Sequence, residues 1–188
     1  MDTETKTDRR ILRTKEAINK AFLELFSEKE LEQITINDIS ERANVNRGTI
    51  YLHYTDKYDL LNKCIDDHLS KMFISCSVID INHEKVNLTG TLKAVFTYFE
   101  QHFLFFSSML SNKRTSLFRE RMLQFIVANK KEKIDEQGIN QDIDKELIIQ
   151  FMSSAFVGIV EWWILKNMPH SPQSMAEQVW RLFERNDI

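Results

Sequence analysis

The sequence contains few of the residues that break helices or build turns. Only four glycines and two prolines occur in 188 residues. A β-sheet protein of this size needs many more turn residues, because each reversal of the chain requires residues that tolerate turn conformations. Apolar residues instead recur at the 3.6-residue period of helices. We therefore predict an all-α fold of about nine helices.

The same shortage of glycine limits the chemistry that the chain can support. The nucleophile-elbow pattern G-x-S-x-G and the phosphate-binding pattern G-x-x-x-x-G-K-[ST] are both absent from the sequence. The acidic residues fall on the polar faces of predicted helices and form no recognisable catalytic arrangement. We therefore expect a protein that is not an enzyme and that uses no cofactor.

Cysteine is also scarce, with only two in the chain. Two cysteines are too few for a disulfide framework, which favours reduced thiols in the cytoplasm. The first ten residues, MDTETKTDRR, lack the apolar core of a signal peptide, so we expect a cytoplasmic protein. The following histidines lack the spacing of metal ligands, and we predict no metal site: His68, His83, His102 and His170.

The chain has no excess of positive charge that would mark a generally basic surface. Its formal net charge is −3. Residues 9–57 contain nine Lys and Arg against eight Asp and Glu, whereas the rest of the chain contains 16 against 20. Any binding to nucleic acid must therefore be local and must depend on a few well-placed side chains.

One long apolar segment meets the length criterion for a membrane span. Residues 147–165 contain a single formally charged residue, Glu161. A central acid costs roughly 3 kcal/mol on insertion scales, and Gln150, Ser153 and Ser154 also interrupt the apolar run. We therefore interpret this segment as a buried helix and expect no membrane partner.

The stretch 35–54, TINDISERANVNRGTIYLHY, has the pattern of two short helices joined by a tight turn. Thr35 can cap the first helix, and Asp38 three residues later completes a capping-box arrangement. Asn46 can cap the second helix. This second helix carries polar side chains outward while Ile50 packs inward, a composition suited to the major groove of DNA.

The helices on either side of this stretch suggest how the chain is divided. Residues 8–27 show the apolar stripe of an amphipathic helix that can brace the pair, whereas residues 1–7 are polar and are expected to be disordered. A long helix that begins near Asp56 would connect the pair to the rest of the chain. We therefore predict a three-helix DNA-binding domain at 8–55 and a helical regulatory and dimerisation domain at 56–188.

Several residues in and after this stretch stand in a fixed register: Thr35, Asp38, Ile39, Ala43, Val45, Gly48, Thr49, Tyr51, Tyr54, Lys57 and Leu60. This pattern resembles the signature of TetR-family transcriptional regulators, and the resemblance covers residues 9–61. The C-terminal stretch FVGIVEWWILKNMPHSPQSMAEQVWRLF is similar, more loosely, to a domain in the subgroup with relatives of dihydroxyacetone-kinase operon activators.

The resemblance implies a homodimer whose three N-terminal helices bind double-stranded DNA at an inverted repeat. In this family a ligand in the C-terminal domain typically changes the spacing of the two DNA-reading helices and releases DNA, and most members repress transcription. We therefore expect a repressor released by a ligand. The alternative is a DNA-binding or adaptor module that a protein partner regulates and that acts as an activator. The sequence leaves open the operator, the ligand and the sign of regulation.

Carried over position by position, the DNA contacts of the family fall on Thr35, Asn46, Arg47, Gly48, Thr49, Tyr51, His53 and Lys57. Arg47 is the candidate reader of guanine, and the methyl group of Thr49 can meet a thymine methyl. Gly48 lets the backbone approach DNA closely, since a Cβ would occupy the gap. Lys57 can supply a positive charge to a phosphate.

The C-terminal half contains more apolar surface than one small domain is expected to bury. A second copy of the chain could cover the surplus, with these predicted interface residues in the last two helices: Met152, Ala155, Ile159, Trp162, Trp163, Val179 and Phe183. A small apolar or aromatic ligand could also be enclosed by Phe96, Phe99, Phe103, Phe118, Met122, Phe125, Phe151 and Phe156. Their helical spacing also fits an ordinary core.

The helical spacing of apolar residues from Leu92 to Phe106 predicts one helix over 92–106 and a break at 107–112.

Overall fold

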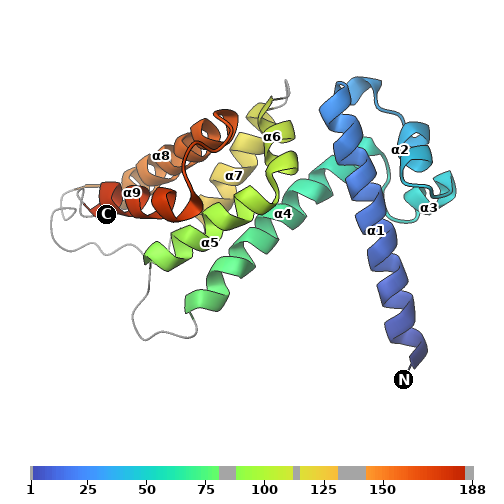
Figure 1. Ribbon diagram of the computed structural model, residues 1–188, viewed down its shortest axis with the longest axis horizontal. Helices are drawn as coiled ribbons and strands as arrows, with labels where there is room; N and C mark the ends of the chain where they lie inside the picture. The colour runs from blue at the N-terminus through green and yellow to red at the C-terminus, as the bar shows by residue number, and fades with distance from the viewer. Residues whose placement is uncertain (1, 81–87, 112–114, 131–142, 185–188) are drawn as a thin grey trace. The chain divides into compact units, whose positions relative to one another are not determined.

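The computed structural model describes residues 2–80, 88–111, 115–130 and 143–184. Regular structure in these residues consists of nine α-helices and one short 3-10 helix, without any strand (Figure 1). The prediction of an all-α fold of about nine helices is confirmed. The chain divides into two compact units, Met1–His68 and Leu69–Ile188.

The first unit comprises, in chain order, α1 (Asp2–Glu28), the 3-10 helix η1 (Leu31–Gln33), α2 (Ile36–Arg42), α3 (Arg47–Tyr51) and the start of α4 (Lys57–Asp80). α2 packs against both α1 and α3. Apolar side chains from every one of these elements are buried, among them Phe22, Leu31, Ile39, Ile50 and Leu60. This shared core holds two very short helices that would not be stable on their own.

The N-terminal boundary of α1 differs from the prediction. The helix begins at Asp2, so the expectation that residues 1–7 are disordered is wrong for the described residues 2–7. No glycine or proline interrupts the sequence between Asp2 and Glu28.

The second unit contains the rest of α4 together with α5 (Leu88–Gln101), α6 (Phe103–Ser111), α7 (Thr115–Lys130), α8 (Lys145–Leu165) and α9 (Pro172–Glu184). α9 packs along α5, and α8 packs along α6 and α7 (Figure 1). Aromatic rings join these layers. The ring of Phe96 on α5 lies 5.2 Å from that of Trp163 on α8, and Phe106 lies 5.9 Å from Phe118 on α7.

The helix predicted over 92–106 is two helices in the structure. α5 ends at Gln101 and α6 runs from Phe103 to Ser111, so the predicted break is wrong for residues 107–111, and residue 112 lies outside the described residues. Backbone hydrogen bonds from His102 N to Tyr98 O and from Phe106 N to His102 O continue across the junction. Buried Phe99 and Phe106 keep helical spacing on both sides of it. The local sequence therefore gives no signal for a break at this point.

α8 is long and apolar enough to pass a length and composition test for a membrane span, and half of its most apolar window is buried inside the protein. A core helix can pass the same test. One face of α8 is packed into the second unit, with Ile148, Met152, Phe156, Val160 and Trp163 all buried. This burial agrees with the interpretation of the segment as a buried helix.

Candidate nucleic-acid interface

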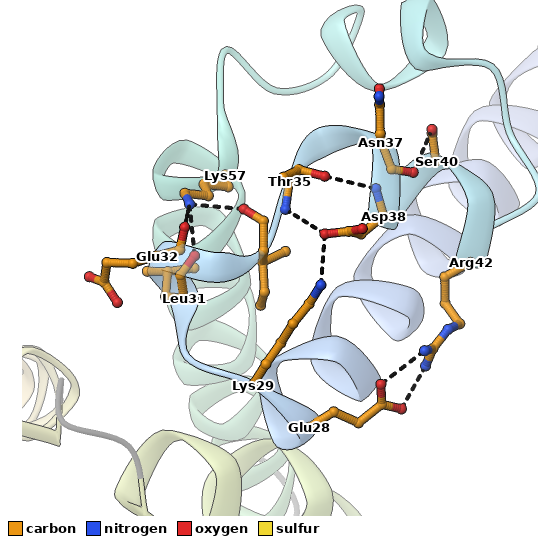
Figure 2. Close-up of polar contacts among 11 residues, drawn as sticks. Glu28, Lys29, Leu31, Glu32, Thr35, Asn37, Asp38, Ser40, Arg42 and Lys57 are labelled. Carbon is orange, nitrogen blue, oxygen red and sulfur yellow. Dashed lines mark hydrogen bonds and ion pairs between the residues drawn. The ribbon is translucent and has the colours of Figure 1, made fainter.

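The start of α2 is fixed by a reciprocal cap. The Thr35 side chain accepts a hydrogen bond from Asp38 N at 3.1 Å, and Asp38 Oδ2 accepts one from Thr35 N at 2.8 Å (Figure 2). The predicted capping box is therefore confirmed. The Thr35 hydroxyl still has its own hydrogen to donate, because it serves as the acceptor in this bond.

Lys29, just beyond the end of α1, reinforces this cap. Its Nζ lies 2.8 Å from Asp38 Oδ2. The Lys29 ammonium, with help from the Thr35 N–H, holds the pKa of Asp38 down to about 2 from an ordinary value of 3.8. One carboxylate thus connects α1 to the first turn of α2, and it stays charged at every physiological pH.

A second polar link binds the end of α1 to the end of α2. The Arg42 guanidinium donates to both carboxylate oxygens of Glu28, at 2.8 and 2.9 Å (Figure 2). This hydrogen bonding lowers the pKa of Glu28 and raises that of Arg42. Neither Lys29 nor Arg42 was among the predicted site residues. Both tie α2 to the C-terminal end of α1.

The turn between α2 and α3 depends on one left-handed residue and one cap. Asn44 has φ 53°, a conformation that asparagine tolerates better than most residues. Asn46 then caps α3 by accepting a hydrogen bond from Gly48 N at 2.8 Å, which confirms the predicted cap. Ile50 is fully buried and anchors α3 to the core.

Arg47 lies across the outer surface of α2 and α3. One guanidinium nitrogen donates to Tyr51 Oη at 3.1 Å, and the guanidinium carbon is 5.5 Å from the centre of the Tyr51 ring. The other terminal nitrogen is 3.4 Å from Asn37 Oδ1 on α2. Asn37 is exposed and was not predicted as a site residue. The available signal was its place two positions after the Thr35 cap, on the outward face of α2.

Gly48 is not required by the packing of the chain itself. It lies within α3, and a Cβ built there would come no closer than 3.4 Å to its nearest neighbour, Asn46 Oδ1. That distance is an ordinary van der Waals contact. The packing of the described residues therefore does not explain a glycine at this exposed position.

His53 and Lys57 are less exposed than the other predicted contacts. His53 is half-buried, its ring lies 6.3 Å from the Tyr54 ring, and its carbonyl accepts a hydrogen bond from Lys63 Nζ at 3.0 Å. Burial raises the pKa of Tyr54 to about 12. Lys57 Nζ is directed at the backbone of η1 and the residues after it, not outward.

The structure places the eight predicted DNA contacts as follows. Thr35, Asn46, Arg47, Gly48 and Tyr51 are exposed, whereas Thr49, His53 and Lys57 are half-buried. All eight belong to the first unit.

The predicted dimer residues fall on two sides of α8 and α9. Met152, Trp163, Val179 and Phe183 are buried in the core of the second unit. Ala155 and Ile159 are half-buried, and Trp162 is 46% exposed. The sequence could not distinguish the two faces because both are apolar.

Most of the predicted pocket residues belong to the aromatic core. Phe96, Phe99, Phe118, Met122 and Phe156 are buried, and Phe103 and Phe125 are half-buried. Phe96 and Phe156 lie 6.0 Å apart, centre to centre. Phe151 is 59% exposed on the other face of α8, so it lies outside this cluster. The ring packing favours the ordinary core that the sequence left open, and the ligand pocket stays a prediction.

Residues 18–64 match the model described as bacterial regulatory proteins of the tetR family, and residues 87–185 match a transcriptional regulator C-terminal region. The chain belongs to the TetR family of transcriptional regulators. TetR regulators are helix-turn-helix proteins that bind DNA and act as dimers, and they are not enzymes.

Individual relatives agree with this assignment. The chain is 27% identical over 184 residues to the uncharacterized HTH-type transcriptional regulator YxbF of Bacillus subtilis, covering 94% of this chain and 46% of YxbF. The chain thus spans about half the length of that relative. A TetR regulator from Streptococcus agalactiae shares the fold at a TM-score of 0.65 and 24% identity, covering 96% and 98% of the two chains. The dihydroxyacetone kinase operon activator DhaS shares the fold at a TM-score of 0.65 and 19% identity, and the match covers 92% of this chain and 95% of DhaS.

Proposed function

We propose that the protein is a dimeric, sequence-specific transcriptional repressor in the cytoplasm that binds an inverted repeat. Residues 8–55 form the DNA-binding domain, and residues 56–188 form the regulatory and dimerisation domain. The observation that carries this proposal is the outer surface of α3. An oriented arginine lies there beside a glycine that the chain does not need for its own packing.

Each polar or methyl group proposed to contact DNA suits one part of it. The Arg47 fork can donate two hydrogen bonds to guanine, and the Thr49 methyl can meet thymine. The hydroxyls of Thr35 and Tyr51 and the His53 ring can donate to phosphate oxygens, which sets position without reading sequence. Close approach of the α3 backbone at Gly48 brings these groups within reach of the groove.

The dimer contact is proposed on the exposed face of α8. Leu147, Phe151, Trp162 and Leu165 are large apolar residues of α8 that the chain leaves exposed, and Leu182 adds one from α9. Gly158 has no atom within 4 Å of the position of a Cβ, which leaves room for a close helix approach. A second copy of the same helix pair would remove this apolar surface from water.

Release by a small apolar or aromatic ligand completes the proposed repressor. The alternative is an activator regulated by a protein partner, and the likeness in fold to DhaS, which is named an operon activator, supports keeping it. The two differ in what changes DNA affinity. A small molecule should lower it in the first case, and a partner protein should change transcription without such a molecule in the second.

Binding-site selection from a random double-stranded DNA library tests the proposal. The wild-type chain should enrich an inverted repeat whose half-site centres lie about 34–36 Å apart or somewhat more, as a two-fold symmetric pair of reading helices requires. Light scattering of the free protein should give twice the monomer mass. Enrichment of a single unsymmetrical site, or of no site, would contradict the proposal.

A further inference from the structure

Lys57 is the predicted phosphate contact whose placement fits that role least. Its Nζ donates three hydrogen bonds, to the carbonyl oxygens of Leu31, Glu32 and Ile34, each at 2.8 Å (Figure 2). An ammonium group has three N–H donors and no acceptor. All three donors are therefore used inside the first unit, and none remains to donate to a phosphate.

We infer that Lys57 is a positioning residue that holds the connector before α2 against the first turn of α4. This inference rests on the proposed function, because the part it positions is the DNA-reading pair. The three carbonyls come from a segment of four residues, so they converge on one point only when η1 is formed as observed. Leu31 and Ile34 are both buried, which keeps that backbone in place beneath the ammonium.

The chemistry of the bonds makes this link strong and specific for lysine. A hydrogen bond from an ionised donor is roughly twice as strong as one between neutral groups. The compact ammonium can direct three N–H groups to three oxygens in different directions, whereas the planar fork of arginine directs its donors in one plane. An arginine at this position would keep the charge and lose the convergence.

The link reaches the residues directly before the start of α2. Ile34 directly precedes the Thr35 cap, and Lys29 binds Asp38 of the same capping box at 2.8 Å. One lysine from the end of α1 and one from the start of α4 thus hold the same helix start. The orientation of α2 and α3 is consequently fixed relative to the first turn of α4. In a dimer this fixed orientation decides which spacing of half-sites both readers can reach together.

The first test uses the unmodified protein and measures the reactivity of individual lysines. The free chain is treated with acetic anhydride, alone and bound to the operator selected above, and each lysine is read by mass spectrometry. Lys57 should react slowly in both states, while the exposed Lys20 of α1 reacts quickly in the free chain. Rapid reaction of Lys57 in the free protein with protection on DNA would overturn the inference in favour of a phosphate contact.

The second test compares K57R and K57Q with the matched surface variant K20Q. Operator affinity is measured against salt, for the selected operator and for one with a base pair inserted between its half-sites. Both Lys57 variants should lose about fivefold or more in affinity with an unchanged salt slope, since no phosphate contact is removed. Both should also discriminate less well between the two spacings, a ratio that mere loss of stability does not change. K20Q should keep the wild-type ratio.

The outcomes separate the inference from the proposed function. Wild-type binding by K57R, together with a salt slope reduced by about one in K57Q, would show a phosphate contact and overturn the positioning role. Unchanged affinity and unchanged spacing preference in both variants would also overturn it. Failure of the wild-type chain to select any DNA would instead contradict the proposed function.

Discussion

The surfaces proposed to bind DNA and a second copy are held in place by different means in the two units. α3 has five residues and depends on caps, on one buried isoleucine and on polar links that surround the DNA-reading pair. α8 has 21 residues and is held by one apolar face packed into the second unit, while its other face is also apolar. Polar contacts fix the orientation of a short element, whereas apolar packing fixes a long one and leaves its outer face available for association.

The largest expected effect is on stability, and it distinguishes the buried face of α8 from its exposed face. Trp163 is fully buried, and its Nε1 donates to His170 O at 2.8 Å, while its neighbour Trp162 is 46% exposed. Trp163→Ala should lower the free energy of unfolding by about 3–5 kcal/mol, as for other buried aromatic residues. Urea denaturation followed by circular dichroism measures this change.

Trp162→Ala is the matched control for that prediction. It removes the same side chain from the outer face, so it should leave the fold intact and shift the mass in light scattering toward the monomer. If Trp162→Ala unfolds the chain while Trp163→Ala spares it, the assignment of core and outer face is reversed.

Sequence alone predicted the starts of α2 and α3 better than the bounds and faces of the C-terminal helices, for a physical reason. Thr35 and Asn46 determine their helix starts through hydrogen bonds within three residues, so local sequence contains the signal. The junction between α5 and α6 and the two faces of α8 were not predicted, because apolar spacing does not encode contacts between distant segments. The position of Lys57 was visible in the sequence, but its three carbonyl partners, 23 to 26 residues earlier, were not.

The next effect concerns the surface of α3. Arg47→Ala should weaken operator binding by roughly 1–3 kcal/mol and relax the preference at one base pair. Asn37→Ala should give a smaller loss, because it removes a group that orients Arg47 and leaves the arginine itself present. Fluorescence anisotropy with the selected operator and its single-base variants measures both. A larger loss for Asn37→Ala would show that Asn37 itself reads DNA.

Removal of a buried hydroxyl in α8 should stabilise the protein, unlike the substitutions above. Ser153 is fully buried, and its Oγ has no hydrogen-bond partner among the described residues. An unsatisfied buried polar atom costs about 1–3 kcal/mol, so Ser153→Ala should raise the free energy of unfolding by about 1 kcal/mol. Exposed Ser154→Ala is the control and should change it little. Destabilisation by Ser153→Ala would mean that the hydroxyl has a partner.

Gly48 in α3 and Gly158 in α8 test the comparison between the units directly. A Cβ at Gly48 or at Gly158 meets no close neighbour within the chain. Replacement by alanine should therefore stabilise either helix by about 0.4–1 kcal/mol. Gly48→Ala should weaken DNA binding and leave the dimer intact, whereas Gly158→Ala should weaken the dimer. Unchanged DNA binding in Gly48→Ala would remove the argument that the groove requires glycine.

The smallest effect concerns the charge that holds the start of α2. The pKa of Asp38 is lowered from 3.8 to about 2, chiefly by the Lys29 ammonium. A carboxyl whose pKa is lower in the folded state stabilises fully above its unfolded value and loses that contribution as pH falls toward the folded value. Asp38→Asn should therefore be less stable than wild type at pH 7, and the difference should shrink between pH 3.8 and about 2. Solvent around this half-exposed carboxylate keeps the effect small.

Glu16→Gln, an exposed change on α1, provides the control for this pH dependence. Urea denaturation at pH 7 and at pH 2.5 should show a smaller Asp38→Asn difference at the lower pH, and no such trend for Glu16→Gln. A difference that persists unchanged at pH 2.5 would mean that hydrogen bonding to the side chain, without its charge, secures the helix. The charge of Asp38 would then not help to hold α2. Among the described residues, the only charged links left to distinguish α2 and α3 from the apolar packing of α8 would be those of Lys57 and Arg42.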